Sequence, residues 1–212
     1  MLEKMDDFFA ARVEGYDEHM INDVGGCREC YEKMAEGMKI LGAKNILDLG
    51  CGTGLELDFI YKLCPGIEVT GIDLTREMLE KLEKKHPDKK LHLINGDYFK
   101  EDFGKNFDAA ISFQTLHHFT REKKLGLYKK LRDALAPGGV YIECDYMCET
   151  DEQEIWMLGE LAKNGGEGSD GKFHFDIPIT VSGQLALLKT AGFSNVEEVL
   201  RVENTVMLVA KK

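Results

Sequence analysis

Residues 45–56 decide the fold and read Asn45-Ile46-Leu47-Asp48-Leu49-Gly50-Cys51-Gly52-Thr53-Gly54-Leu55-Glu56. Ile46, Leu47 and Leu49 form a short apolar run that is typical of a buried strand. Every second residue is then a glycine, and apolar residues at helical spacing resume at Leu55. Glycine allows positive φ and has no Cβ, so a strand, a glycine turn and a helix in this order can present backbone N–H groups to a ligand.

Apolar runs and helical patterns alternate on both sides of this unit. We expect a helix over 27–41, strands over 67–72, 91–94, 107–113 and 140–144, and helices capped by Thr75, Thr120 and Ser182. Such alternation predicts an α/β fold with a doubly wound sheet and helices on both faces. Residues 196–202 and 205–210 predict a closing hairpin, so the sheet should be seven-stranded and mostly parallel, with one antiparallel pairing at its C-terminal end.

The length of 212 residues suits a single domain spanning 1–212. Two segments depart from the alternating pattern: an N-terminal arm over 1–25 and an insertion over 147–181. Both carry aromatic residues in polar or glycine-rich sequence, and residues 164–171 predict flexibility. The arm and the insertion could close over a substrate through Tyr16, Trp156 and Phe173, or their aromatic residues could simply anchor them to the domain.

Composition excludes several functional classes. The formal net charge of −11 argues against nucleic acids and anionic membranes as partners. We also expect a cytoplasmic protein, because the sequence lacks a long apolar run and its first residues lack the pattern of a signal peptide. Lysine-rich stretches at 81–90 and 123–132 are predicted to be solvated helix faces.

Six cysteines raise the question of a metal site. Cys27 and Cys30 have the spacing of a metal-binding pair, and Cys144 and Cys148 could complete four ligands. Cys27 and Cys30 also share helical spacing with apolar residues, which favours a packed helix face. We therefore expect free thiols and no metal.

Three acids lie near the ends of the first three predicted strands: Asp48, Asp73 and Asp97. Parallel sheets bind ligands at the carboxyl ends of their strands, so these acids should surround one crevice. Asp73 could hold ribose hydroxyls or could favour a helix N-terminus. Asp97 could accept a hydrogen bond from an adenine amino group or could stabilise a turn, and Asp48 could bind the positive end of an amino acid or fix the glycine turn.

These segments together resemble the class I S-adenosylmethionine-dependent methyltransferases of the small-molecule type. Residues 47–54 resemble the family's first motif, residues 69–74 the second, residues 94–97 the adenine motif, residues 107–119 the fourth-strand motif and residues 131–139 the motif that follows. The resemblance implies a Rossmann-like fold and S-adenosyl-L-methionine as cofactor. It also implies cofactor binding by Asp48, Gly50, Cys51, Gly52, Asp73, Leu74, Asp97, Tyr98, Ser112 and Phe113.

The resemblance does not identify the methyl acceptor. The absence of a signature for methylation of nucleic-acid bases, and of a basic patch, favours a small molecule. Direct displacement needs a general base only if the nucleophile is protonated, and His117, His118 and His174 are candidates, although a packing role is the alternative for each. An NAD-type oxidoreductase is disfavoured because Leu55 replaces the third glycine of the dinucleotide fingerprint. A binding module without chemistry also remains an alternative, and the oligomeric state stays open.

Overall fold

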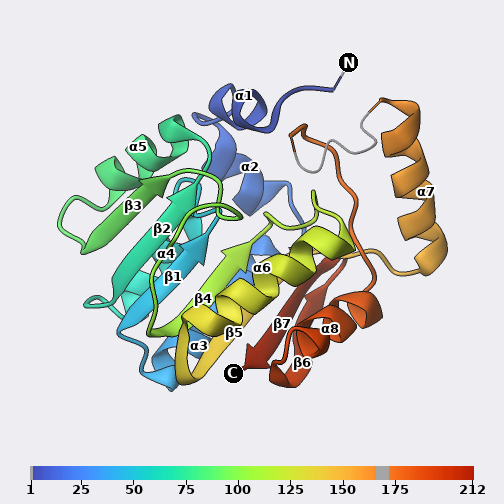
Figure 1. Ribbon diagram of the computed structural model, residues 1–212. Coiled ribbons are helices and arrows are strands. Elements are labelled where there is room, and N and C mark those ends of the chain that lie inside the picture. Colours follow the sequence, from blue (N-terminus) through green and yellow to red (C-terminus); the bar gives the residue numbers. More distant parts are fainter. Residues whose placement is uncertain (1, 166–171) are drawn as a thin grey trace.

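The structure is a computed structural model that describes residues 2–165 and 172–212. A seven-stranded sheet in the order β3-β2-β1-β4-β5-β7-β6 runs through this part of the chain (Figure 1). Its strands are β1 (Asn45–Leu49), β2 (Glu68–Asp73), β3 (Leu91–Asn95), β4 (Phe107–Phe113), β5 (Leu135–Tyr146), β6 (Ser194–Val202) and β7 (Thr205–Lys211). Strands β1 to β5 pair in parallel, and β7 is antiparallel to both β5 and β6. The predicted fold class is confirmed.

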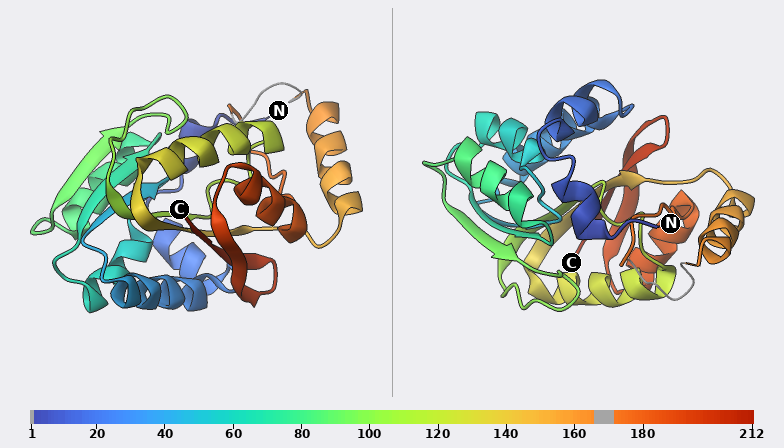
Figure 2. Two further views of the ribbon diagram at one scale, coloured as in Figure 1. Left: turned by 60° about the horizontal axis from the view of Figure 1, so that its bottom comes forward. Right: turned by 90° about the horizontal axis from the view of Figure 1, so that it is seen from above.

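Helices cover both faces of the sheet, because alternate residues of its central strands point to opposite sides. One face packs against α3 (Cys27–Leu41), α4 (Leu55–Leu63) and α5 (Arg76–Lys85), and the other packs against α6 (Arg121–Ala134) and α8 (Val181–Thr190). Within β4, Ala109 and Ile111 belong to the first layer of packing, and Ala110 belongs to the second. Both layers are visible in the two views of Figure 2.

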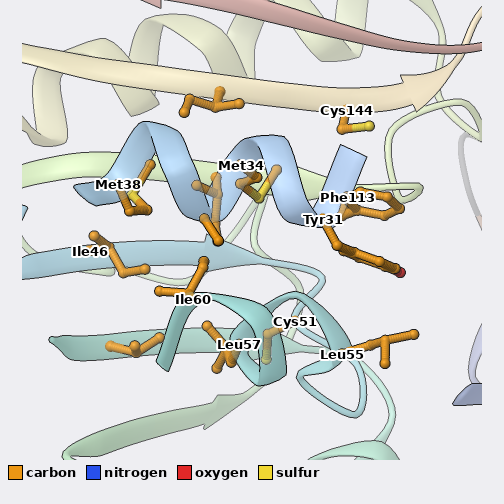
Figure 3. Close-up of a cluster of buried hydrophobic side chains, with 14 of the residues drawn as sticks. Tyr31, Met34, Met38, Ile46, Cys51, Leu55, Leu57, Ile60, Phe113 and Cys144 are labelled. Atoms are coloured by element: carbon orange, nitrogen blue, oxygen red, sulfur yellow. The ribbon is translucent and has the colours of Figure 1, made fainter. Parts of the chain in front are cut away.

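The packing of α3 settles the interpretation of the cysteine pair. Cys27, Cys30, Met34 and Met38 are fully buried on the side of α3 that faces the sheet. Figure 3 shows this helix between β1 and β5, with Cys144 of β5 facing it. The predicted helix-face packing of Cys27 and Cys30 is therefore observed, and the helix ends at Gly42 with φ 63°. Tyr31 of the same helix stacks on Phe113 with ring centroids 3.9 Å apart.

The arm and the insertion contain more regular structure than the sequence analysis predicts. The arm forms α1 (Met5–Ala10) and α2 (Tyr16–Asn22), each with one buried methionine. The insertion forms α7 (Asp151–Lys163), which stands apart from the sheet in Figure 2. Thr150 and Gln153 form a capping box at its start, a signal that was present in the sequence. The predicted flexible stretch lies largely outside the described residues.

Two element boundaries also differ from prediction. The N-cap of α8 is Thr180 rather than Ser182, because the Thr180 hydroxyl accepts a hydrogen bond from the backbone N–H of Gly183 at 3.2 Å. Strand β5 begins at Leu135 rather than Val140, since Leu135 already pairs with Phe107 before an irregularity in the ladder. These shifts leave the topology unchanged.

The prediction of solvated lysine-rich faces is wrong at Lys124. This side chain is only 2% exposed and lies among the carboxyl groups of Asp145, Glu143 and Glu154. Burial lowers the pKa of Lys124, and these acids oppose the shift.

Among the described helices, none has the length and apolar character that crossing a membrane would require.

Candidate functional site

The glycine turn joins β1 to α4 and takes the backbone into the left-handed region. Gly50, Gly52 and Gly54 have φ values of 67°, 48° and 69°. The carboxylate of Asp73, at the end of β2, accepts hydrogen bonds from the backbone N–H of Gly52 at 2.9 Å and of Thr75 at 2.7 Å. Burial raises the pKa of Asp73, although these two amides oppose the shift. Asp73 thus joins the turn after β1 to the start of α5.

A cavity of about 720 Å³ opens at the carboxyl ends of β1 to β4, and we call it the first cavity. Its polar wall includes Asp73 and Asp97, and Gly50, Leu74 and Tyr98 also line it. Asp97 accepts a hydrogen bond from the backbone N–H of Phe99 at 3.0 Å and pairs with Lys100, also at 3.0 Å. The carboxylate therefore stabilises a turn and lines the cavity at the same time.

A second cavity of about 650 Å³ lies between the arm and the loops after β4 and β5. Aromatic residues and histidines form much of its wall: Phe8, Phe9, Tyr16, His19, His117, His118, Tyr146 and His174. Phe9 and His118 line both cavities, so the two spaces adjoin. The two cavities therefore share part of their wall.

A cluster of three imidazoles and two carboxylates lies at the second cavity. Nδ1 of His117 is 2.6 Å from Oδ1 of Asp145, whose other oxygen accepts a hydrogen bond from the backbone N–H of Leu116. Oδ1 of Asp176 is 3.2 Å from Nδ1 of His118 and 3.6 Å from Nε2 of His117. His174 lies next to His118, with ring centroids 4.9 Å apart.

Burial and mutual repulsion keep two of these imidazoles neutral at physiological pH. Burial, with His117 close by, lowers the pKa of His118 to about 4, and burial also lowers the pKa of His174. Burial works against ionisation of Asp176, yet the neighbouring imidazoles, His118 first, lower the pKa of Asp176 to about 2. The cluster thus combines an ionised carboxylate with neutral imidazoles, each of which has a lone pair on one ring nitrogen.

The arm and the insertion meet beside both cavities. Lys4 and Phe173 form an antiparallel bridge, in which the backbone N–H of Met5 donates to Lys172 O at 3.0 Å and that of His174 donates to Glu3 O at 2.9 Å. The ring of Phe8 stacks on His174 at 3.5 Å and 8°. We call this contact the arm bridge, and it covers the two cavities from one side.

Comparison with known proteins identifies the family. A family model described as a methyltransferase domain matches residues 46–139, which include the glycine turn and the acids of the first cavity. Residues 46–139 are therefore a methyltransferase domain, of the class I S-adenosylmethionine-dependent type. The prediction made from its motifs is confirmed.

Relatives and a solved structure support the same assignment. A cypemycin N-terminal methyltransferase of a Streptomyces species is 29% identical over 127 residues, covering 58% of this chain and 49% of the relative. A carboxy-S-adenosyl-L-methionine synthase of Campylobacter curvus is 27% identical over 189 residues, covering 82% and 80%. Human N-acetylserotonin methyltransferase in complex with S-adenosylmethionine has a TM-score of 0.70 at 17% identity, covering 96% of this chain and 55% of that one, a likeness that shows the fold. The chain therefore spans about half the length of the first relative and of this structure.

The methyltransferase domain carries a buried acidic pair that fits a cationic ligand. Asp48 and Glu56 are 1% and 6% exposed, and Oδ2 of Asp48 and Oε1 of Glu56 have no hydrogen-bond partner among the described residues. Burial and the nearby Glu56 raise the pKa of Asp48 well above its usual value, and burial raises the pKa of Glu56 to about 7. Neither residue lines the first or the second cavity. Because the two carboxyl groups are buried beside the glycine turn, a cationic group close to them would offset the cost of ionising them.

The structure brings most of the predicted site residues to the cavities. Gly50, Asp73, Leu74, Asp97, Tyr98 and Phe173 line the first cavity, Tyr16, His117 and His174 line the second, and His118 lines both. Gly52 contributes its backbone N–H to Asp73 beside them. Their roles toward a cofactor or an acceptor stay predictions.

Six predicted residues do not line either cavity. Absent from the described residues along the two cavity walls are Asp48, Cys51, Gly52, Ser112, Phe113 and Trp156. Ser112 is buried and contacts the hydroxyl of Tyr141 at 2.7 Å, because its side chain points into the packing beneath α6 and α8. Trp156 is 60% exposed on α7 and does not face the site.

Sequence reasoning missed three residues at the site: Thr115, Asp145 and Asp176. Thr115 lines the first cavity and accepts the Tyr98 hydroxyl at its carbonyl, 3.2 Å away. Asp145 lies near the carboxyl end of β5, so the rule that identified Asp48, Asp73 and Asp97 would have found it too. Asp176, two residues after His174, was identifiable only once the cluster had been assembled.

Proposed function

We propose that the protein transfers a methyl group from S-adenosyl-L-methionine to a small-molecule acceptor. The observation that carries this proposal is the pair of adjoining cavities with a shared wall of Phe9 and His118. One cavity lies over the glycine turn and the strand-end acids, where this family holds its cofactor. The other has the aromatic lining and the convergent polar groups expected of a small-molecule site.

The residues that would hold the cofactor follow from their positions. Asp73 would accept hydrogen bonds from the ribose, Asp97 would accept from the adenine amino group, and Leu74, 44% exposed at the cavity, would cover the adenine ring. Asp48 and Glu56 would balance the charge of the amino group. Gly52 leaves room for the ligand, because the nearest atom to a Cβ added at this position would be Gly50 O at 3.9 Å.

The bound cofactor supplies a methyl group already activated on a sulfonium, so the protein's main task is proximity and orientation. Phe8, Phe9 and Tyr16 would hold an apolar acceptor body and exclude water. Neutral imidazoles at His118 and His174 could take a proton from the acceptor, and Asp145 fixes His117 so that its Nε2 faces Asp176. The methyl acceptor is a protonated oxygen or nitrogen in this proposal.

Two alternatives are less well supported. An NAD-type oxidoreductase would need a third glycine where Leu55 begins α4, and Leu55 is buried in the core. A module that only binds the cofactor would not explain a second cavity lined by imidazoles. A net charge of −11 continues to argue against nucleic acid or membrane partners, and a cytoplasmic location remains our expectation.

The cofactor assignment is tested by calorimetric titration with S-adenosylmethionine and its demethylated product. We expect Asp73→Ala to weaken both, because losing a hydrogen-bond acceptor at a buried polar contact typically costs ~1–3 kcal/mol, a factor of roughly 5 to 150 in affinity. Asp88→Ala, an exposed aspartate outside the site, should leave both affinities unchanged.

Acceptor chemistry is tested with radiolabelled methyl groups. Incubation of the protein with labelled S-adenosylmethionine and a metabolite extract should move label into a small molecule. Binding of the cofactor with no label transferred to any extract would favour the non-catalytic module. Unchanged affinity in Asp73→Ala would overturn the cofactor assignment.

A further inference from the structure

Three side chains at the second cavity point their donor atoms at one small volume. Within residues 2–165 and 172–212, one ligand atom each from His117, His118 and Asp176 lies within 4.8 Å of the other two. Oδ1 of Asp176 is buried and accepts no hydrogen bond of good geometry from the described residues. An ionised oxygen in that position favours a cation between it and the imidazoles.

The spacing of these atoms matches the ligands of a single metal ion. Metal bonds of 2.0–2.2 Å in a tetrahedral site place neighbouring ligand atoms about 3.3 Å apart. Oδ1 of Asp176 lies 3.2 Å from Nδ1 of His118 and 3.6 Å from Nε2 of His117. These two separations fit the ligands of one ion, and the ligand atoms of the two histidines lie within 4.8 Å of each other.

The surroundings of His117 also suit a metal ligand. Oδ1 of Asp145, which is 2% exposed, accepts a hydrogen bond from the Nδ1–H of His117 at 2.6 Å, and the lone pair then lies on Nε2, which faces Asp176. Metal-binding histidines commonly donate their second ring N–H to a carboxylate in this way. Asp145 is itself held by the backbone N–H groups of Leu116 and Tyr146.

His118 has one competing partner. Its Nδ1 is 3.3 Å from the carbonyl oxygen of Phe175, a long contact, and a proton on Nδ1 would serve that oxygen and Asp176 together. A metal ion would replace this proton. His118 is 4% exposed and its ring is enclosed by Phe9 and His174, so the direction of Nδ1 is restricted.

We propose that Nε2 of His117, Nδ1 of His118 and Asp176 bind one transition-metal dication of the Zn²⁺ class, with its open coordination positions facing the second cavity. Two imidazoles and one carboxylate favour such ions over Mg²⁺ or Ca²⁺, which prefer oxygen ligands. The charge of the ion balances Asp145 and Asp176. None of the cysteines takes part, so the proposal replaces the sequence-based expectation of no metal, which considered the cysteines alone.

The role of the ion rests on the proposed methyltransferase function. A hydroxyl group of the acceptor would occupy an open position and lose its proton more easily, to His174 or to solvent, because a bound cation stabilises the oxyanion. As a metal ligand, His118 would then not serve as the base. The oxygen then forms the new O–CH₃ bond while the S–CH₃ bond breaks, and its electron pair remains on sulfur. The acceptor class is therefore a hydroxylated small molecule able to ligate a metal.

Calorimetric titration of chelator-treated protein with Zn²⁺ tests the site. We expect one equivalent to bind to the unmodified protein, and Asp176→Asn and His117→Gln each to lower Zn²⁺ affinity at least tenfold. Asp145→Asn should lower it as well, because removing a ligand's hydrogen-bond partner typically costs 10–100-fold. The matched control is His19→Gln: His19 lines the same cavity but pairs with Asp23, and its loss should leave Zn²⁺ affinity unchanged.

Several outcomes would overturn the metal site. These are the absence of stoichiometric binding, undiminished binding by Asp176→Asn, or displacement of Zn²⁺ by an equal concentration of Mg²⁺. Co²⁺ as a second probe should give absorption bands without thiolate-to-metal charge transfer, and thiolate bands would assign the ion to the cysteines instead. Titration of the same samples with S-adenosylmethionine separates the two proposals, because a failed metal site leaves cofactor binding intact, whereas a failed cofactor assignment leaves Zn²⁺ binding intact.

Discussion

Asp48 and Glu56 form a buried acidic pair beside the glycine turn. Both carboxyl groups are buried, and each has an oxygen without a partner among the described residues. A folded protein tolerates such a pair by keeping protons on it, and this makes folding depend on pH. A cationic ligand would remove that cost, so the pair couples stability to binding.

Glu56 gives the first prediction at this scale. Its pKa in the folded protein is about 7, above the usual value of 4.5, so its contribution to stability is fully present below pH 4.5 and is lost as the pH rises through 7. In protein without ligand, Glu56→Gln should therefore flatten the dependence of the free energy of unfolding on pH between 5.5 and 8. The gain at pH 8 should be up to about 3 kcal/mol, measured by chemical denaturation.

Glu83→Gln serves as the matched control, because Glu83 is exposed on the neighbouring helix α5. It should reproduce the pH dependence of the unmodified protein. If Glu56→Gln also reproduced it, the carboxyl group of Glu56 would not be the source of the dependence.

Gly52 gives a second prediction, on the glycine turn. A methyl group at φ 48° costs roughly 1–2 kcal/mol of backbone strain and projects into open space. We expect Gly52→Ala to remain folded and to bind S-adenosylmethionine at least tenfold more weakly, because the methyl group occupies space meant for the ligand.

The control for backbone strain is Gly42→Ala. Gly42 has φ 63° and an equally open surrounding, but it lies at the end of α3, outside the site. Both substitutions should lower stability by similar amounts, and only Gly52→Ala should lower affinity. Equal affinities in the two variants would make the turn purely structural.

At the scale of elements, predictions from sequence succeeded where hydrophobic periodicity is strong. The helix predicted over 27–41 is α3 (Cys27–Leu41), and the strand predicted over 107–113 is β4 (Phe107–Phe113). Helix α3 is buried along one continuous face, and strand β4 is buried on both faces. Burial alone therefore determines which of their positions are apolar.

Helix α7 shows why periodicity failed in the insertion. Glu154 is the one buried residue of this helix, and its carboxylate pairs with Arg121. Ile155, Trp156 and Leu158 are exposed, so no apolar stripe marks the buried side. The same reason explains the wrong prediction for Trp156. A single aromatic residue in a polar helix does not show whether its face of the helix will be buried or exposed.

The candidate site was predictable to the extent that it depends on strand ends. Asp73 and Asp97 came from that rule, whereas the contact of Asp176 with His118 depends on how a long loop returns to β4. Residues in such loops carry no periodic signal. The meeting of arm and insertion at Lys4 and Phe173 was likewise beyond any local pattern.

Two aromatic residues test which of these segments serves the site. Phe9 of α1 lines both cavities, so Phe9→Ala should weaken cofactor binding and reduce methyl transfer at least tenfold. Trp156→Ala removes an equally large ring from an exposed face of α7 and should change neither quantity. Steady-state rates and calorimetry on the two variants check this, and a loss of activity in Trp156→Ala alone would reverse the assignment.

The whole molecule consists of a sheet with its packed helices and a cover in which the arm and the insertion meet. At the centre of the sheet, β4 and β5 pair along their length. By contrast, the arm bridge joins the arm to the insertion through two backbone hydrogen bonds and one ring stack. Local opening of such a cover requires much less free energy than global unfolding. The sheet and the cover should therefore respond separately to truncation.

Hydrogen exchange after removal of residues 1–12 checks this separation. The truncation keeps α2, whose Asp17 contacts Thr53 and Lys85. It removes Glu3, whose carbonyl oxygen accepts the hydrogen bond from the backbone N–H of His174. Exchange at His174 should become faster, while exchange at Ile111 in β4 stays unchanged. Slower or unaltered exchange at His174 would show that the arm does not hold the segment that contains it.

The arm bridge also determines how the protein can exchange its ligands. Two hydrogen bonds contribute about 1–3 kcal/mol together, whereas unfolding a domain costs about 5–15 kcal/mol. Thermal motion can therefore separate Glu3–Met5 from Lys172–His174 many times before the sheet opens once. We expect departure of the spent cofactor to require this separation, so the cover opens for each exchange of ligands while the sheet stays intact.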